Sequence, residues 1–363
     1  MEVKQQKKPV VKIIGLIILA LFVVLFISLF AWYQINRDVP LGATMAISAV
    51  ERTDEVPVIS APLSSESLVV PQYKVTPLAG GDEQPMPAKV PLCGDDNEWM
   101  VLAVGIDYRG QDYLYGLSDI VRLVKIDFTK QQVKVIALPR NLLVNPPQSL
   151  DIQGPILLNQ AYLFGTKGMG HYEGSGFGAG SLADTVYHSF GIKTDHYLVV
   201  DFHAFIKFID AIGGIEVDLP TYVDDRPYGY FPPGKQTLSG DEALYLARIR
   251  TKYSDLVRIS NQTTVLKAVL NRVKEPGVLI KLPGLSESMI KSVLTDATPE
   301  QVNTLLCLVR KIDSEDVVFY GAPEELMTNS NILIPNMSAE MNVYQWGQPF
   351  VNWLYESLLE VLE

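Results

Sequence analysis

Charged residues that could act together stand beside three short apolar runs of the chain. Asp107 directly follows the first run, Asp119 directly precedes the second, Arg109 lies between them, and Arg140 follows the third. If these runs are neighbouring antiparallel strands, two carboxylates and two guanidiniums meet at one edge of a sheet. That edge is either a functional rim or a surface loop that carries these residues by chance.

A second polar group lies further along the chain. The repeat Ala-Arg-Ile-Arg places Arg248 and Arg250 on one face if the segment is extended. Two neighbouring guanidiniums are costly to hold together unless an anion lies between them, although nearby acids could also offset them. Asp255, Arg258 and Gln262 follow at the start of a predicted helix, among apolar neighbours, where the last two are one turn apart. This pattern is more typical of a lined site than of a solvated face.

The elements that must position these residues are predicted by the period of the apolar residues. Strands are expected over residues 100–106, 120–126 and 133–138, and the polar stretch 129–132 has the length of a hairpin connection. A three-stranded meander is the simplest arrangement of these runs.

The chain then alternates helices and strands. Residues 181–190 and 202–212 have helical patterns that stop at glycine, whereas residues 197–200 and 215–219 read as strands. A capping box at Ser239–Glu242 opens another helix. The expected fold class is α/β, more closely an α+β mixed sheet flanked by helices, in a single domain.

Composition excludes several classes of protein. With 363 residues, 48% of them apolar, the chain can bury a large core without disulfides or metals. The two cysteines cannot form a zinc ribbon, and no histidine spacing suggests a metal site or a nucleophilic triad. A net charge of −11 repels a phosphate backbone, so no nucleic-acid partner is expected. The glycine-rich stretch 168–180 matches no phosphate-binding motif and is predicted as a loop.

The start of the chain predicts a membrane anchor. Residues 1–12 carry four lysines, and residues 13–33 are an uninterrupted apolar run, about 31 Å long as a helix and close to the thickness of a bilayer's hydrocarbon core. The run is longer than that of a secretory signal and lacks a small-residue cleavage site, so we expect a retained transmembrane signal-anchor. The lysines place residues 1–12 in the cytoplasm and the rest of this single-pass cell-membrane protein outside.

Residues 34–97 are predicted to be an extracytoplasmic stalk. Eight prolines from Pro40 to Pro91, with scattered serine, glycine and acidic residues, give neither a helical nor a strand period. Such a segment is extended and holds the next domain away from the membrane. Cys93 at its end and Cys307 in an apolar helical stretch could pair or remain thiols.

A series of motifs over residues 99–275 resembles, in order, the LytR-CpsA-Psr family of transferases that move cell-wall glycopolymers to peptidoglycan. The resemblance implies a catalytic domain at residues 98–275 and an apolar tunnel beside the sheet for a lipid tail. It also implies transfer of an anionic glycopolymer from a polyprenyl diphosphate carrier to a hydroxyl of peptidoglycan or another wall glycan. The motifs are Val-Gly-Ile-Asp107, Ser-Asp119, Leu-Pro-Arg140, Leu-Asn159-Gln-Ala-Tyr, Asp195-His-Tyr-Leu-Val-Val-Asp-Phe, Asp210-Ala-Ile-Gly-Gly-Ile-Glu-Val-Asp-Leu-Pro, Gly229-Tyr-Phe-Pro-Pro-Gly-Lys, and Ala247-Arg-Ile-Arg with Arg258 and Gln262.

The same resemblance implies roles for individual residues. Asp107 and Asp119 match the family's carboxylates that hold Mg²⁺, a cation that typically uses one or two carboxylates beside phosphate oxygens. Arg140, Arg248 and Arg250 match guanidiniums that clamp phosphate in a forked geometry, and these five residues form the implied catalytic set. The implied substrate-binding residues are Arg109, Asn159, Asp255, Arg258 and Gln262.

Three positions depart from the family pattern. Leu117 stands where arginine is usual, Leu157 where lysine is frequent, and Asn141 where aspartate is usual. If the missing arginine acts like an arginine finger, its loss slows transfer by about 10³ to 10⁵, unless Arg109 or Arg122 takes its place. The alternative function is therefore a catalytically weakened or inactive relative that binds polyprenyl-linked glycan or scaffolds envelope assembly.

Residues 276–363 lie beyond these motifs and are predicted as a helical extension packed on the domain. A capping box at Thr298–Gln301, with proline at the first helical position, opens a helix to about residue 312, and residues 317–320 read as a strand. Residues 344–362 are predicted as a closing helix. Its aromatic residues are expected to face the core rather than to stack on carbohydrate.

Overall fold

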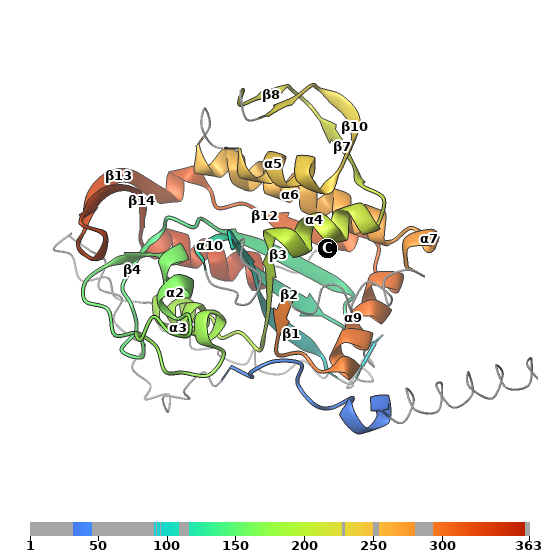
Figure 1. The fold of residues 1–363 in the computed structure, drawn as a ribbon, viewed down its shortest axis with the longest axis horizontal. Coiled ribbons are helices and arrows are strands. Elements are labelled where there is room, and N and C mark those ends of the chain that lie inside the picture. The colour runs from blue at the N-terminus through green and yellow to red at the C-terminus, as the bar shows by residue number, and fades with distance from the viewer. Residues whose placement is uncertain are drawn as a thin grey trace, which may run out of the picture.

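A six-stranded mixed sheet forms the centre of the computed structural model (Figure 1). The structure describes residues 32–45, 91, 93–94, 96–108, 116–226, 229–249, 254–279 and 293–359. The strand order is β11-β6-β1-β2-β3-β12, and helices flank the sheet as the sequence predicts. These strands are β1 (Glu98–Ile106), β2 (Ser118–Asp127), β3 (Gln132–Leu138), β6 (His196–Asp201), β11 (Val293–Thr295) and β12 (Val317–Tyr320).

The meander predicted from the three apolar runs is confirmed. Strands β1, β2 and β3 pair antiparallel in sequence order, while β6 lies parallel beside β1 and β12 lies parallel beside β3. The chain therefore returns the end of β1, the start of β2 and the end of β3 to one edge of the sheet. Between β3 and β6 it forms β4 (Leu143–Val144), β5 (Ile156–Leu157), α2 (Leu158–Phe164) and α3 (Phe177–Phe190).

Separate hydrophobic clusters lie against the sheet. The largest joins sheet residues such as Leu102 and Leu123 to helices α2, α3 and α10 (Gln348–Leu359). On β1 and β2, Trp99 and Ile126 pack instead on Leu308 of α9 (Pro299–Lys311). The predicted glycine-rich loop 168–180 ends early, because α3 begins at Phe177.

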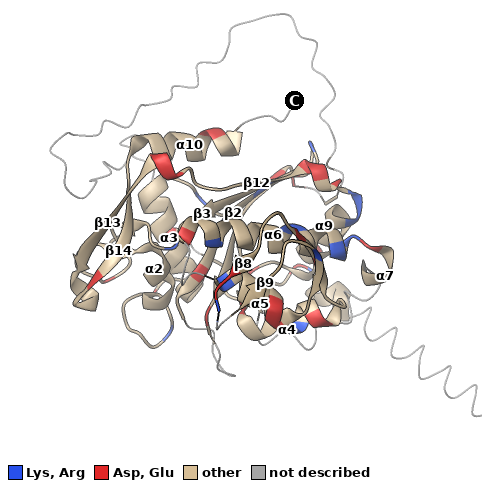
Figure 2. Cartoon of the chain, turned by 90° about the horizontal axis from the view of Figure 1, so that it is seen from above, with Lys and Arg blue, Asp and Glu red and all other residues tan. Residues whose placement is uncertain are grey.

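A further layer is built by the chain after β6. It contains α4 (Phe202–Ala211), β7 (Ile215–Leu219), β8 (Val223–Asp224), β9 (Tyr230–Phe231), β10 (Gly234–Leu238), α5 (Gly240–Arg248), α6 (Asp255–Val273) and α7 (Pro276–Leu279). The capping box that opens α5 is present, since the Ser239 and Glu242 side chains each accept a backbone N–H of the other residue. Figure 2 shows that acidic and basic residues are intermixed along this layer and the strands beneath it.

The C-terminal part differs from the predicted helical extension. The predicted helix after Thr298 and the predicted strand 317–320 are confirmed as α9 and β12. However, β11 and β12 are the outer strands of the central sheet, so the sheet is not complete by residue 275. The predicted closing helix 344–362 is wrong at its start: β13 (Met327–Ile334) and β14 (Ala339–Trp346) form a hairpin, and α10 begins only after Gly347. The aromatic residues of the segment 344–362 face the core as expected, because the rings of Trp346 on β14 and Phe350 on α10 both pack on Phe190.

The N-terminal part is described only from residue 32. Most of the predicted anchor, residues 13–31, lies outside the described residues, and no helix within the described part is long and apolar enough to cross a bilayer. Residues 34–45, predicted as the start of an unpacked stalk, instead lie on the domain, where the Tyr197 hydroxyl donates to the Ala43 carbonyl at 2.8 Å. That part of the stalk prediction is wrong. Cys93 and Cys307 form a disulfide.

Candidate functional site

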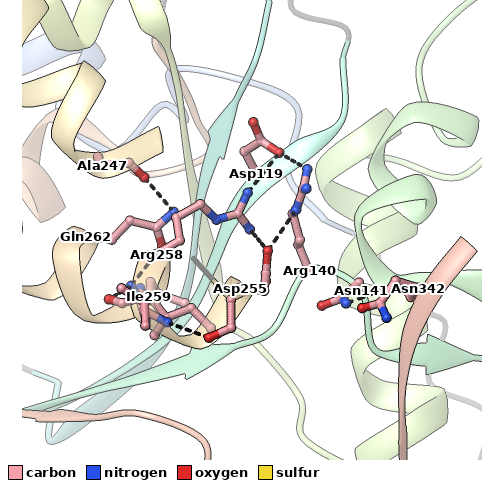
Figure 3. A network of polar contacts seen from close by, with 12 residues as sticks. Asp119, Arg140, Asn141, Ala247, Asp255, Arg258, Ile259, Gln262 and Asn342 are labelled. Atoms are coloured by element: carbon pink, nitrogen blue, oxygen red, sulfur yellow. Dashed lines mark hydrogen bonds and ion pairs between the residues drawn. The ribbon is translucent and has the colours of Figure 1, made fainter. Parts of the chain in front are cut away.

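Four charged side chains form a closed network at the edge of the sheet (Figure 3). Arg140 Nη1 donates to Asp119 Oδ1 at 2.5 Å, and Arg140 Nε donates to Asp255 Oδ1 at 3.4 Å. Arg258 completes the ring, with its Nη2 atom 2.8 Å from Asp255 Oδ1 and its Nη1 atom 3.8 Å from Asp119 Oδ1. All four side chains are largely buried, at 3% to 16% exposure. Each carboxylate is thus shared by two guanidiniums.

Helix α6 positions Asp255 and Arg258. Ser254 caps this helix through its hydroxyl, which accepts the Val257 N–H, and the acidic Asp255 occupies the first turn, where the helix dipole favours negative charge. Arg258 follows one turn later on the same face. The start of α6 therefore presents a carboxylate and a guanidinium together to the sheet edge.

Arg140 is positioned by the backbone just beyond β3. Its carbonyl accepts the Asn159 N–H at 2.9 Å, which ties the segment after β3 to the start of α2. Asn159 itself is 4% exposed. Within the described residues its Oδ1 atom has no hydrogen-bond partner.

A β-bulge sets the direction of Asp119. The β1–β2 register steps from Gly105 opposite Ile120 to Ile106 opposite Ser118, so Asp119 is the extra residue on β2. Ser118 donates to the Asn159 carbonyl on the α2 side of the sheet, whereas Asp119 contacts Arg258 on α6. A bulge re-aims side chains in this way, since regular alternation would fix which face each residue occupies.

A third guanidinium, that of Arg122, lies behind the network. Arg122 Nη2 donates to Gln262 Oε1 at 3.1 Å and to the Ile259 carbonyl at 3.4 Å, and Gln262 Nε2 donates to the Ala247 carbonyl. Burial, together with the positive charge of Arg258, lowers the pKa of Arg122 to about 10. Arg122 is 3% exposed and forms no ion pair within the described residues.

Among the described residues, buried guanidiniums outnumber the carboxylates that contact them. Arg122, Arg140 and Arg258 lie together around Asp119 and Asp255, and the carboxylate of Asp107 forms no ion pair with them. An uncompensated charge away from water is costly, and a bound anion is the usual compensation. The geometry is therefore that of an anion site.

Asp107 lies at the end of β1, beside the bulge. Its Oδ1 atom accepts the Leu117 N–H at 3.1 Å, and Gly116 allows this close approach, because a Cβ atom there would come within 2.9 Å of the same oxygen. Neither Asp107 Oδ2 nor Asp119 Oδ2 is bonded within the described residues.

Two uncommitted carboxylate oxygens at one strand edge are suitable ligands for a hard cation. The described part of the chain contains no cluster of three or more metal-binding side chains. The residues therefore fit a cation that takes its remaining ligands from phosphate or water.

Three predicted residues are not seen in the described network. Arg248 is the last residue of α5 rather than part of an extended segment, so the face-sharing argument for Arg248 and Arg250 is wrong, because the helical pattern continues through residue 248. The Arg248 guanidinium lies over the Phe202 ring, 4.4 Å from its centroid, in a hollow between α4 and α5. Arg109 and Arg250 lie outside the described residues.

The leucines that replace basic residues have different surroundings. Leu157 is 3% exposed and packs in a small cluster with Leu143, Ile334 and Val343, so its side chain faces hydrophobic residues of the β13–β14 hairpin. Leu117 is partly buried and contributes its backbone N–H to Asp107. The sequence suggests Arg122 only as a substitute for the missing charge. Its position inside the apolar run 120–126 is the signal that could have identified it as a site residue.

Comparison with known proteins gives consistent results. A family model described as the LytR_cpsA_psr family matches residues 77–347. The chain is 29% identical over 205 residues to the polyisoprenyl-teichoic acid–peptidoglycan teichoic acid transferase TagV of Bacillus subtilis. The matched segment covers 54% of this chain and 49% of TagV. It is also 29% identical over 209 residues to the TagU transferase of Oceanobacillus iheyensis, covering 57% of this chain and 61% of TagU. The chain thus spans only about half to three-fifths of these relatives.

Solved structures share the fold. The crystal structure of B. subtilis TagV has a TM-score of 0.56 at 24% identity and covers 73% of this chain and 96% of that chain. A structure described as TagT bound to LIIa-WTA has a TM-score of 0.55 at 20% identity and covers 72% of this chain and 89% of that chain. At these identities the likeness extends to the arrangement of helices and strands.

Proposed function

Because the chain belongs to the LytR-CpsA-Psr family, we propose that it is a membrane-anchored phosphotransferase of the cell wall. It moves an anionic glycopolymer from a polyprenyl diphosphate carrier to a hydroxyl of peptidoglycan or another wall glycan. The names of TagV and TagU, which specify a polyisoprenyl-linked teichoic acid and peptidoglycan, support this class of donor and acceptor. The observation that carries the proposal is the excess of buried guanidinium at the sheet edge.

The ion network offers a binding mode for the diphosphate. Arg140 and Arg258 are held in place by shared carboxylates, so both guanidiniums are ordered before an anion arrives. Phosphate oxygens can then accept forked hydrogen bonds from the two arginines, while Arg122 adds positive potential from behind. As the sugar phosphate is transferred, negative charge grows on the leaving phosphate, and preorganised donors stabilise it.

The carboxylates have two further tasks. Asp107 and Asp119 would hold Mg²⁺, which when bound would neutralise charge on the diphosphate. Asp107 forms no ion pair within the described residues, so it is the carboxylate that can accept the proton of the acceptor hydroxyl. Arg248 and Arg250 are proposed to contact the diphosphate, and Arg109 and Asn159 to contact the rest of the substrate.

The compartment follows from two features. The apolar run 13–33 behind four lysines supports a single-pass anchor with its N-terminus in the cytoplasm. The disulfide between Cys93 and Cys307 supports an extracytoplasmic location for the domain, because disulfides persist mainly in oxidising compartments.

The test is transfer by the full chain in lipid vesicles. A polyprenyl diphosphate carrying a labelled anionic saccharide is supplied with peptidoglycan fragments, with Mg²⁺ or with EDTA. We expect label on the peptidoglycan only with Mg²⁺. Arg140→Ala and Arg258→Ala should each lower kcat by about 100-fold or more, the typical loss when one charge-stabilising group is removed.

A matched control is available on the surface. Arg226 also pairs with an aspartate, at 2.6 Å, but is exposed and distant from the network in sequence, so Arg226→Ala should transfer at the wild-type rate. Equal losses in all three variants would show that the network has no special role.

The alternative is a non-catalytic relative, and Leu117 and Leu157 are the observations that favour it. Such a protein would bind polyprenyl-linked glycan or scaffold envelope assembly. In the same vesicles it would retain the labelled lipid and give neither transfer nor hydrolysis at any Mg²⁺ concentration. That result would replace the transferase proposal.

A further inference from the structure

Residues 32–45, here called the collar, include the last two residues of the predicted anchor and lie on the domain. A short helical turn covers residues 32–36. The Tyr33 hydroxyl donates to Glu300 Oε2 at 2.5 Å and accepts from Asn303 Nδ2 at 2.7 Å, and both partners belong to α9. Tyr33 is also the last residue of the apolar run, so the end of the predicted anchor is hydrogen-bonded directly to the domain.

Backbone hydrogen bonds continue this contact. The Glu300 N–H donates to the Arg37 carbonyl at 3.0 Å, and the Leu41 N–H donates to the Ala297 carbonyl at 3.1 Å. The collar therefore supplies an acceptor to the first turn of α9, whose backbone N–H groups have no partner within the helix. This is a specific docking rather than a chance approach of two surface loops.

The end of the collar fits closely against the sheet. A Cβ atom on Gly42 would come within 2.5 Å of the Thr295 carbonyl oxygen of β11, so only glycine fits at this position. The next carbonyl, of Ala43, accepts the Tyr197 hydroxyl of β6, and burial raises the pKa of that tyrosine to about 12. The Ser175 hydroxyl donates to the Thr44 carbonyl, and Met45 packs against the main core.

Helix α9 also carries the cysteine that is bonded to Cys93. Cys307 is bonded to Cys93 and lies one turn after Asn303, on the same face as the residue that contacts Tyr33. The start of the collar and Cys93 thus both bond to α9, whereas the end of the collar lies beside the start of α3, where Ser175 donates to the Thr44 carbonyl. The length of chain between residues 45 and 93 therefore does not set the distance between the anchor and the domain.

The outer side of the collar is apolar. Trp32, Ile35, Val39 and Leu41 are all more than half exposed. Tryptophan and tyrosine are enriched where a membrane span meets water, and Trp32 and Tyr33 end the apolar run. Figure 1 shows the collar in blue along one side of the molecule, opposite the layer that contains β7, β8 and β10.

We propose that the collar seats one face of the domain on the outer surface of the bilayer. This face consists of the start of β6, β11 and the first turn of α9. The inference rests on the membrane anchor of the proposed function and adds a fixed orientation in place of a stalk. On this proposal the length of residues 46–92 does not set the distance between the domain and the membrane.

The orientation has a consequence for the site. Tyr197, which holds the collar, lies beside Leu102 of β1, whereas Asp107 follows the end of that strand. Five residues further along a strand correspond to about 16 Å. The collar therefore contacts the start of β6, opposite the middle of β1, whereas the charged network lies beyond the end of β1, so the site has a set height and direction above the lipid.

The test uses the full chain in nanodiscs of phosphatidylglycerol and phosphatidylcholine that carry an energy acceptor on the headgroups. Both native cysteines are in the disulfide, so a cysteine added at one position can be labelled alone. Lys193→Cys lies shortly before β6, and Lys235→Cys lies on β10 in the opposite layer. We expect strong quenching of the first label and weak quenching of the second, and deletion of residues 50–88 should leave both values unchanged.

Two variants separate the collar from a stalk. Gly42→Val, which collides with Thr295, and Tyr197→Phe, which lacks the hydroxyl, should each reduce the difference between the two labels. Equal quenching of the two labels in the wild type, or a change after the deletion, would overturn the proposal, as would failure of the chain to insert into nanodiscs. A chain that keeps the quenching pattern but does not transfer glycan would refute the transferase and leave the collar in place.

Discussion

The Arg122 side chain is held at a cost in free energy that its own contacts do not explain. It is buried beside the positive Arg258, and within the described residues its hydrogen bonds go only to neutral oxygens. A diphosphate in the network would reduce that cost. Burying a cation of this kind is therefore better explained by ligand binding than by stability of the fold.

Inorganic pyrophosphate should therefore stabilise the protein through Arg122. At 100 times Kd a ligand raises the free energy of unfolding by about 2.7 kcal/mol, which differential scanning fluorimetry detects as a rise in Tm. We expect Arg122→Met to bind about tenfold more weakly, a difference of about 1.4 kcal/mol. Arg226→Met, a change at an exposed arginine, should show the same pyrophosphate-induced rise in Tm as the wild type. Equal pyrophosphate shifts in the wild type and Arg122→Met would contradict this role.

At Leu117, in contrast, a substitution should increase activity. Its backbone lies beside Asp107, so an arginine at this position can extend its guanidinium toward the same strand edge. Leu117→Arg should raise kcat for glycan transfer by about tenfold or more if the missing charge limits turnover, since an arginine finger contributes about 10³ to 10⁵.

The control for this gain is Leu117→Met, which changes shape without adding charge and should leave kcat unaltered. If Leu117→Arg transfers at the wild-type rate, Arg122 or another guanidinium already supplies the charge, and the departure from the family pattern has no catalytic cost.

At the scale of elements, the sequence was informative wherever a local pattern decides the structure. The apolar runs predicted the three meander strands, and the capping boxes at Ser239 and Thr298 predicted the starts of α5 and α9. The meander brings Asp119 and Arg140 to the same edge of the sheet. These features depend on residues close together in the chain.

Features that depend on distant contacts were missed. Strand β11 was not predicted, because it is short and reaches the sheet only through pairing with β6. Strand β12 was predicted at residues 317–320, but its place beside β3 in the central sheet was not. The bulge at Asp119 is an irregularity of register, and a register is a property of two strands. The collar contains proline and glycine and was predicted as a stalk, because its partners on α9 come more than 250 residues later, as the Tyr33–Glu300 pair shows.

Helix α9 supports both the collar and the disulfide, so its start can be tested separately. The Thr298 hydroxyl accepts the Gln301 N–H, and the Gln301 side chain accepts the Thr298 N–H. Thr298→Ala should lower the free energy of unfolding by about 1 kcal/mol, the typical value of an N-cap, measured by urea denaturation. Thr264→Ala, at an exposed position within α6, removes a hydroxyl that serves no cap and should change it by less than about 0.5 kcal/mol. Equal effects would mean that the cap contributes nothing.

For the molecule as a whole, the disulfide closes most of the domain into one loop. Cys93 and Cys307 are separated by 214 positions, and a long loop gives a crosslink a large effect on the entropy of the unfolded chain. Reduction should lower the free energy of unfolding by about 2 to 5 kcal/mol, measured by chemical denaturation with and without dithiothreitol. The double variant Cys93→Ser and Cys307→Ser should be insensitive to the reductant. A reductant effect of equal size on that variant would assign the loss to another cause.

The binding of the collar to the domain also makes this protein a practical display scaffold. A fluorescent protein or an affinity tag placed between residues 60 and 80 follows the collar in the chain, so it should add cargo without moving the anchor relative to the sheet. Enzymes tethered by a true spacer would swing on a longer arm after such a fusion. This one should carry the passenger at its side and keep its working distance from the lipid.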